Sequence, residues 1–128
     1  MTQGFPMNVL DRRIAVIDDD LRVLESLVNL LASFGYDAES FNSAEQFLES
    51  GTLSRTSCIV TDVEMRQMSG LGLLQFLKSS NCTVPVIIIT GKPSERSEAF
   101  YLKRGAVGFF RKPVDGEALI ELIGSVCV

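Results

Sequence analysis

Ser57-Cys58-Ile59-Val60-Thr61-Asp62 is a short apolar run, rich in β-branched residues, that stops at a carboxylate. A run of this kind predicts a buried strand. An acid at the end of such a strand lies at the carboxyl edge of the sheet, which is where open α/β folds place their ligands. Taken alone, Asp62 could equally be a turn residue or a helix cap. Residues at the ends of other strands are needed to decide its role.

Four further short runs have the character of strands, and each is followed by helical spacing or a capping signal. The predicted strands are residues 14–17, 36–41, 86–89 and 107–110. Helices are predicted over residues 24–34, after Ser43, after Ser69, within residues 92–104 and after Asp115. From residue 14 to the helix after Asp115, the chain is therefore predicted to alternate strand and helix.

Two of these segments differ from the rest in polarity. The run at 86–89 is entirely apolar, so we expect it to be covered on both faces and to lie at the centre of the sheet. The segment 92–104 is more polar, and its clearly apolar residues are Ala99, Phe100 and Leu102. This composition predicts a marginal helix.

Strands that alternate with helices imply a parallel sheet, because each right-handed crossover carries its helix back over the sheet. We therefore predict a doubly wound α/β fold with five parallel strands in the order 2-1-3-4-5 and helices on both faces. The switch point of this order lies between the strands at 14–17 and 57–62. Residues 1–12 are assigned to an N-terminal extension and residues 13–128 to the folded domain.

Composition excludes several classes of function. The chain has 128 residues, which suits one domain, and its 46% hydrophobic and 22% charged residues are typical of a soluble globular protein. A formal charge of −4 with scattered Lys and Arg argues against a nucleic-acid surface. The sequence contains no histidine, which excludes imidazole acid–base chemistry and histidine metal ligands.

The cysteines and the N-terminal segment bear on the compartment. Cys58 and Cys127 lie in apolar runs and are expected to be small buried hydrophobes, and the odd number of thiols indicates a reducing compartment. Residues 1–11 are too few and too weakly hydrophobic for a signal peptide, and no apolar run approaches membrane-spanning length. We therefore expect a cytoplasmic protein without a membrane partner.

Asp18 and Asp19 follow the first predicted strand, and the predicted topology puts them beside Asp62 at one crevice. Carboxylates crowded together repel one another unless they take up protons or bind a cation. Oxygen ligands without His or suitably spaced Cys favour a hard ion. The sequence therefore predicts a Mg²⁺ site, at which Mn²⁺ can substitute, whereas Asp20 is interpreted as the cap of the following helix.

Thr90 and Lys112 add a hydroxyl and a cation at the ends of two later strands. Singly, each would be an ordinary strand-end or surface residue. Together with the acids and a metal they supply what phosphoryl transfer requires, namely an Asp nucleophile and positive charge that neutralises the transferred oxygens. Gly91, directly after Thr90, lets the backbone come close.

Four motifs together give the chain a resemblance to a known family. They are Ile17-Asp18-Asp19-Asp20, Thr61-Asp62-Val63-Glu64-Met65 with Met68-Ser69-Gly70, Ile89-Thr90-Gly91, and Gly105-Ala106 through Phe109 to Lys112-Pro113. Over residues 12–127 the chain resembles the receiver domain of bacterial two-component response regulators, in the CheY-like superfamily and in particular its FixJ-type group. The resemblance implies the same doubly wound fold.

This resemblance assigns a role to each residue of the acid cluster. It implies that Asp62 is the phosphoacceptor. The implied metal ligands are Asp18, Asp19, Asp62 and the backbone carbonyl of Glu64, with Asp19 a more direct ligand than Asp18. Lys112 matches the lysine that contacts the phosphoryl group in this family.

Thr90 and Phe109 match the family's switch pair, and the Lys112–Pro113 peptide bond is expected to be cis. Phosphorylation adds about −1.5 to −2 charges at Asp62, so Thr90 can move toward the new oxygens and vacate a space into which Phe109 turns. Such a rotation would alter the surface formed by the last two helices and the strand between them.

The function implied by the resemblance is phosphorelay signal transduction, with a sensor histidine kinase or another phosphotransfer protein as the donor. The domain would be a signalling receiver rather than an enzyme, catalysing only the phosphorylation and dephosphorylation of its own Asp62. The resemblance leaves room for a phosphorylation-linked homodimer through the surface just described. It also leaves room for a DNA-binding output domain outside this one.

Three alternatives are weighed against this function. A receiver-like module that docks without phosphorylation would not need the complete set of acids, Thr90 and Lys112. A flavodoxin-like FMN carrier would need hydroxyl and Gly residues after its first strand, where acids would repel the phosphate. A haloacid-dehalogenase-type phosphatase has a second Asp two positions beyond its nucleophile, and Asp18 and Asp20 have this spacing. The Thr expected after the second Asp is missing, because Leu21 follows Asp20.

Two further features concern the loop after Asp62. The family commonly has Met-Pro there, whereas this chain has Met65-Arg66, which removes a backbone restraint. Glu64 and Lys92 lie two positions beyond Asp62 and Thr90. We hypothesise that their side chains approach one another over the pocket and modulate dephosphorylation, and the alternative is a pair of solvated charges.

Overall fold

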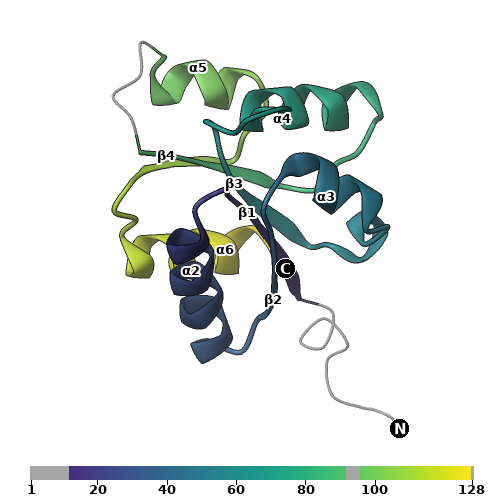
Figure 1. The fold of residues 1–128 in the computed structure, drawn as a ribbon. Coiled ribbons are helices and arrows are strands. Elements are labelled where there is room, and N and C mark those ends of the chain that lie inside the picture. Colours follow the sequence, from purple (N-terminus) through teal and green to yellow (C-terminus); the bar gives the residue numbers. More distant parts are fainter. Residues whose placement is uncertain (1–11, 92–95, 128) are drawn as a thin grey trace, which may run out of the picture.

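In the computed structural model, which describes residues 12–91 and 96–127, the strands pair into one parallel sheet in the order β2-β1-β3-β4-β5 (Figure 1). They are β1 (Arg13–Ile17), β2 (Asp37–Phe41), β3 (Cys58–Asp62), β4 (Val86–Thr90) and β5 (Gly108–Arg111). The predicted doubly wound fold and strand order are confirmed. The prediction of a central β4 is wrong, because β3 occupies the middle and is buried as completely as β4.

Helices cover both faces of the sheet. In the described part of the chain they are α2 (Leu21–Ser33), α3 (Ala44–Glu49), α4 (Gly70–Ser79), α5 (Glu98–Lys103) and α6 (Gly116–Val126), with one 3₁₀ turn, η1 (Leu53–Arg55). Figure 1 shows α3, α4 and α5 on one face and α2 and α6 on the other. As predicted, the side chains of Ser43, Ser69 and Asp115 cap α3, α4 and α6.

The core consists of two layers, one on each face of the sheet, because successive residues of a strand point to opposite faces. Ile59 and Ile88 pack on the side of α3, α4 and α5. Their neighbours Val60 and Ile87 pack on the other side, with residues of α2 and α6. Cover on both faces explains why the inner strands read as continuous apolar runs.

The periphery of the fold matches its sequence character. β2 is mostly exposed, as expected for an edge strand, and Cys58 and Cys127 are buried as predicted. Within the segment predicted as a marginal helix, residues 98–103 form α5, while residues 92–95 lie outside the described residues. Residues 1–11 of the assigned N-terminal extension also lie outside them. None of the helices that the structure describes has the length and apolar character needed to cross a membrane.

Candidate functional site

The carboxyl edge of the sheet gathers the buried polar side chains. Among the described residues these are Asp18, Thr61, Asp62 and Thr90. Asp18 follows β1, Thr61 and Asp62 end β3, and Thr90 ends β4. Parallel strands present their carboxyl ends at one edge, so the topology brings together residues that are far apart in the sequence.

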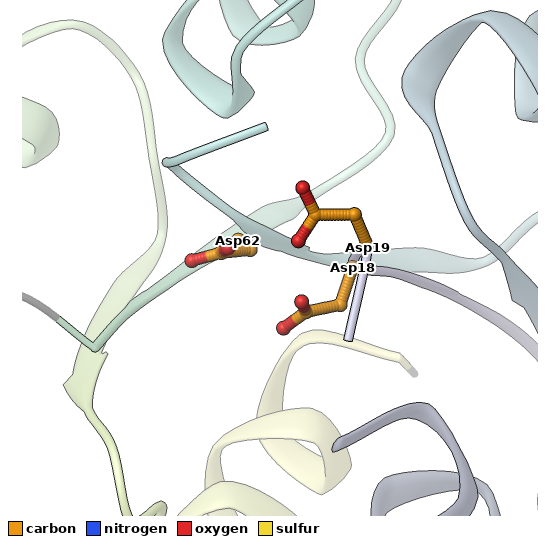
Figure 2. A group of neighbouring side chains, drawn as sticks. All are labelled: Asp18, Asp19 and Asp62. Atoms are coloured by element: carbon orange, nitrogen blue, oxygen red, sulfur yellow. The ribbon is translucent and has the colours of Figure 1, made fainter. Parts of the chain in front are cut away.

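Asp18, Asp19 and Asp62 form a cluster of carboxylates at this edge (Figure 2). One oxygen of each lies within 4.8 Å of the others. The pairing of β1 with β3 places Ile17 opposite Thr61, which brings the next residue of each strand side by side. Asp18 is fully buried and Asp62 is 3% exposed, whereas Asp19 is open to solvent. The three acids that the sequence predicted to be neighbours therefore lie together.

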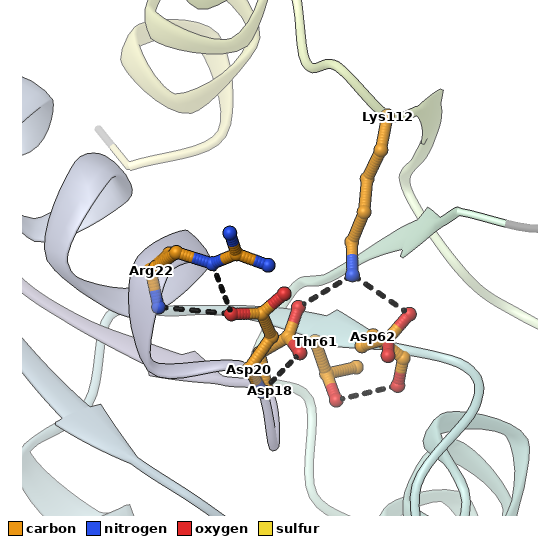
Figure 3. Close-up of polar contacts among 6 residues, drawn as sticks. All are labelled: Asp18, Asp20, Arg22, Thr61, Asp62 and Lys112. Carbon is orange, nitrogen blue, oxygen red and sulfur yellow. Dashed lines mark hydrogen bonds and ion pairs between the residues drawn. The ribbon is translucent and has the colours of Figure 1, made fainter.

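Lys112 reaches the acids from the connection between β5 and α6 (Figure 3). Its Nζ lies 2.8 Å from Asp18 Oδ2 and 3.5 Å from Asp62 Oδ1. One ammonium group is therefore shared by two buried carboxylates. The ion pair with Asp18 is a contact that the sequence analysis did not predict, since it assigned Lys112 to the phosphoryl group alone.

Backbone contacts with β4 fix the start of the Lys112 side chain. The Lys112 N–H donates to the Thr90 carbonyl oxygen at 2.8 Å. A Cβ at position 91 would lie 3.2 Å from Lys112 Cδ, so Gly91 gives the lysine chain room to run toward the acids. The Lys112–Pro113 peptide bond is cis.

The electrostatics of the cluster disfavour a charge on Asp62. Burial and the neighbouring Asp18 raise the pKa of Asp62 from 3.8 to about 6, although Lys112 and the Glu64 backbone N–H act in the opposite direction. Burial lowers the pKa of Lys112, but its hydrogen bond and charge interaction with Asp18, together with the charge of Asp62, outweigh burial and raise that pKa overall. Lys112 is therefore a permanent cation, and a second cation at the site would favour the ionised form of Asp62.

The donor set fits a hard divalent cation such as Mg²⁺. Asp18 Oδ2 and Asp62 Oδ1 are buried, and their ion pairs with Lys112 Nζ leave lone pairs free on both oxygens. The ligand atoms of Asp18, Asp19 and Asp62 are all carboxylate oxygens, which Mg²⁺ prefers. Glu64, whose backbone carbonyl is also a predicted ligand, lies in the loop that leaves β3. The carboxylate ligands of one such ion would come from the end of β3 and from the residues after β1.

Asp20 belongs to helix α2 rather than to the cluster. Its Oδ1 accepts a hydrogen bond from the Arg22 N–H at 2.9 Å and lies 3.7 Å from Arg22 Nε (Figure 3). The hydrogen bond from the Arg22 N–H is the main cause that lowers the pKa of Asp20. The Asp20 N–H in turn donates to Asp18 Oδ1 at 2.9 Å, so the start of the helix helps to orient Asp18. The predicted cap is confirmed.

Thr90 and Phe109 lie on one face of the sheet. Strand pairing puts Ile88 opposite Phe109, and Thr90, two residues beyond Ile88, points to the same side. Phe109 is half-buried, and its ring stacks on that of Tyr101 with the centroids 5.5 Å apart. The Arg111 guanidinium carbon lies 5.5 Å from the Phe109 ring centroid. The ring of Phe109 thus has a buried aromatic side chain and a cation as neighbours.

Tyr101 is the residue of this region that the sequence analysis missed. The apolar residues identified there were Ala99, Phe100 and Leu102, yet Tyr101 is the buried residue of α5, at 1% exposure, and Leu102 is exposed. A helix of six residues spans less than two turns, so its spacing cannot identify the inward face. The available signal was an aromatic ring inside the short apolar run that ends at Leu102.

The loop after Asp62 contains Glu64, one of the two residues predicted to modulate dephosphorylation. Glu64 is exposed, whereas Lys92 lies outside the described residues, as does the predicted approach of the two side chains. The Val63 N–H donates to the Ile89 carbonyl oxygen at 3.0 Å, which fixes where the loop leaves β3. The role of the Glu64 and Lys92 pair stays a hypothesis.

Comparison with known sequences identifies similar proteins. The family model for the response regulator receiver domain matches residues 14–124. Response regulator protein TodT from Pseudomonas putida strain F1 is 39% identical over 113 residues, which are 88% of this chain and 48% of that protein. Transcriptional regulatory protein FixJ from Azorhizobium caulinodans is 40% identical over 110 residues, which are 86% of this chain and 52% of that protein. The chain thus spans about half the length of the curated relatives it matches.

Solved structures include similar folds. The response regulator StyR has a TM-score of 0.83 and 34% sequence identity, with 91% of this chain and 59% of that chain covered. The structure named FixJ-N has a TM-score of 0.79 and 31% identity, with 91% of this chain and 93% of that chain covered. These proteins share the arrangement of strands and helices described above.

Proposed function

Because this chain belongs to the family of response regulator receiver domains, the signalling modules of two-component systems, we propose that it accepts a phosphoryl group on Asp62 from a sensor histidine kinase. The observation that carries this proposal is the cluster at the carboxyl edge. There Asp62 lies beside two further acids and 3.5 Å from Lys112 Nζ. The module is not a classical enzyme, and its proposed chemistry is limited to gaining and losing this one group.

Asp62 and Lys112 have distinct parts in the proposed transfer. A carboxylate oxygen of Asp62 attacks phosphorus, and the bond to the donor's leaving atom breaks with its electron pair on the donor, which yields an acyl phosphate. Lys112 Nζ lies beside Asp62 Oδ1, where it can pair with oxygens of the transferred group. With a pKa of about 6, Asp62 is mostly ionised at neutral pH and can act as the nucleophile.

We assign Mg²⁺ binding to Asp18, Asp19, Asp62 and the Glu64 backbone carbonyl. When bound, Mg²⁺ would neutralise negative charge on the phosphoryl oxygens. The contribution of the protein is to hold the carboxylates close together in advance, through the pairing of β1 with β3 and the hydrogen bond from the Asp20 N–H to Asp18. Little rearrangement is then needed when the ion binds.

We further infer that Thr90 and Phe109 transmit the acyl phosphate to the surface. The Thr90 hydroxyl moves toward the new oxygens, and Phe109 turns into the space it leaves. The shared face of the two residues and the half-buried position of Phe109 support this. The rotation changes the surface of α5, β5 and α6, which is the proposed site of a phosphorylation-linked homodimer.

We propose that the switched surface controls an output in the cytoplasm. FixJ is named a transcriptional regulatory protein, and by analogy the proposed output is transcription. The three cysteines are free thiols, which agrees with the reducing compartment expected from the sequence.

Incubation with acetyl phosphate tests the acceptor role. With Mg²⁺ present, the wild-type chain should gain the mass of one phosphoryl group, and addition of EDTA should prevent the gain. Asp62→Asn should gain none. The matched control is Asp37→Asn, which changes an exposed aspartate at the opposite end of the sheet and should be phosphorylated like the wild type. An adduct that persists in Asp62→Asn contradicts the assignment, and no adduct on the wild type favours a receiver-like docking module.

A further inference from the structure

The first turn of α3 contains one acidic side chain, Glu45, and one amide side chain, Gln46, and the two have different partners. Gln46 completes the helix cap, because its N–H donates to Ser43 Oγ at 3.0 Å and its Oε1 accepts from the Asn42 N–H at 2.7 Å. Glu45 takes no part in that cap. Its Oε2 instead accepts a hydrogen bond from the backbone N–H of Met68 at 2.9 Å, across 23 residues of sequence. One side chain of α3 therefore binds the backbone of the loop that follows the phosphoacceptor.

That loop, residues 63–69, is held at both ends by backbone bonds. The Val63 N–H donates to Ile89 O at 3.0 Å, and the Gly70 N–H donates to Val63 O at 3.1 Å. A Cβ at Gly70 would overlap the carbonyl oxygen of Asp62, so the end of the loop packs directly on the phosphoacceptor's own backbone. A displacement of the loop near Met68 would consequently be passed to Asp62.

Between these ends the sequence supplies little stiffness. Position 66 is Arg and not Pro, so its φ angle is unrestrained by a ring, and residues 66 and 67 are exposed. The hydrogen bond to Glu45 ties this section, at Met68, to a separate element of the fold. Because the acceptor is a carboxylate, the bond is of the stronger, charge-assisted kind.

The second oxygen of Glu45 shows that this arrangement has a cost. Oε1 is buried and has no hydrogen-bond partner among the described residues. A buried carboxylate oxygen without a partner opposes folding. The unpartnered oxygen offsets part of what the other oxygen gains, and the hydrogen bond to Met68 is the specific contact that the structure gives Glu45.

We propose that Glu45 is a positioning residue for the phosphoacceptor loop: by holding Met68 it fixes residues 63–69 and thereby the Glu64 backbone carbonyl that helps to bind Mg²⁺. The inference rests on the proposed function for its Mg²⁺ and phosphate readouts, but not for the hydrogen bond itself. Loss of the bond would let the loop move, which weakens Mg²⁺ binding and changes the lifetime of the acyl phosphate.

Three variants test the proposal. Glu45→Ala should lower Mg²⁺ affinity about tenfold in a calorimetric titration, the size typical of a lost outer partner of a metal ligand. It should also speed amide hydrogen exchange at Met68. Glu45→Gln keeps an acceptor oxygen for the Met68 N–H and, although the neutral bond is weaker, should lose clearly less Mg²⁺ affinity than Glu45→Ala. Arg66→Pro, added to Glu45→Ala, should restore most of the Mg²⁺ affinity by stiffening the loop from within.

Glu49→Ala is the matched control, since Glu49 is an exposed glutamate at the other end of α3, and it should leave both readouts unchanged. Unaltered Met68 exchange and Mg²⁺ affinity in Glu45→Ala overturn the proposal. An equal loss in Glu45→Gln without recovery through Arg66→Pro also overturns it, because charge and not position would then matter. If the wild type takes up no phosphate, the proposed function is wrong. The rate of amide hydrogen exchange at Met68 still tests whether Glu45 holds the loop.

Discussion

The two edges of the sheet have opposite characters, although the same strands form both. At the carboxyl edge, Asp18, Asp62 and Thr90 are buried. At the amino edge the first buried residues are apolar or thiols, and Cys58 packs in the layer that also contains Cys127. There Cys127 Sγ lies 3.7 Å from the Ser57 carbonyl oxygen. Burial at the amino edge therefore stabilises the folded state, whereas the buried polar and charged groups at the carboxyl edge lower the free energy of unfolding.

This difference indicates that the functional site lies at the carboxyl edge. Buried like charges oppose folding, so a chain selected for stability alone would replace them with apolar side chains. At the carboxyl edge the chain keeps them and adds Lys112, which offsets part of their repulsion. Removal of an acid at the carboxyl edge should consequently stabilise the metal-free protein, whereas loss of its cation, or a polar substitution at the amino edge, should destabilise it.

Replacing Lys112 should have the largest effect. Lys112→Met leaves Asp18 and Asp62 buried without their cation, which should destabilise the metal-free protein by about 2 to 4 kcal/mol, somewhat below a fully buried pair because the lysine is partly exposed. Urea unfolding at neutral pH in EDTA measures this change. An unchanged midpoint would show that the ammonium does not offset the repulsion between the acids.

A polar change at the amino edge should come next. Cys58→Ser puts a hydroxyl where a fully buried thiol packs among apolar residues, and it should destabilise the protein by about 1 to 3 kcal/mol. Phosphorylation of the folded protein should be unaffected, because the site lies at the other end of β3. Urea unfolding and the acetyl phosphate assay measure the two effects, and a loss of phosphorylation would contradict the separation of the edges.

Asp62→Asn should act in the opposite direction to both. Since burial raises the pKa of Asp62 from 3.8 to about 6, the folded state holds its proton more tightly than the unfolded state, and the metal-free wild type should lose stability as the pH rises from about 4 to 6. That loss is at most about 3 kcal/mol, and about 1 to 2 kcal/mol after solvent screening. The variant should lack this pH slope and be more stable at pH 7 in EDTA. Equal pH profiles for the two proteins would refute the argument.

Asp20 should show the smallest effect, despite lying next to the acid cluster. Asp20→Asn keeps a side-chain oxygen for the Arg22 N–H, so both the thermal midpoint and Mg²⁺-dependent phosphorylation should stay near those of the wild type. A large loss of Mg²⁺ affinity in this variant would place Asp20 among the ligands and enlarge the site.

Much of the fold could be predicted because its determinants are local. Short apolar runs, serine and aspartate caps and the glycine after α2, which has a φ of +88°, each identify an element or its end. The neighbourhood of Asp18, Asp19 and Asp62 followed from topology, since the order 2-1-3-4-5 puts the ends of β1 and β3 side by side.

The remaining features depend on side-chain reach and packing, which sequence spacing does not determine. That Lys112 bridges Asp18 and Asp62 depends on the path of its side chain past Gly91. The contact of Glu45 with Met68 joins residues 23 positions apart. A capping motif alone does not say whether Glu45 or Gln46 completes the cap and which of the two is free to contact another element. The predicted strand order already puts β3 in the middle, and the apolar character of β4, which indicated a central β4, reflects cover on both faces and not its place in the order.

The most direct test of the account is to find the phosphorylated residue chemically. The chain is phosphorylated with acetyl phosphate and Mg²⁺, and the acyl phosphate is reduced with borohydride, which converts a phosphorylated aspartate to homoserine that peptide mass analysis can locate. The account predicts homoserine at position 62 and unmodified aspartate at positions 18 and 19. Homoserine at either of those positions, or at none, would contradict it.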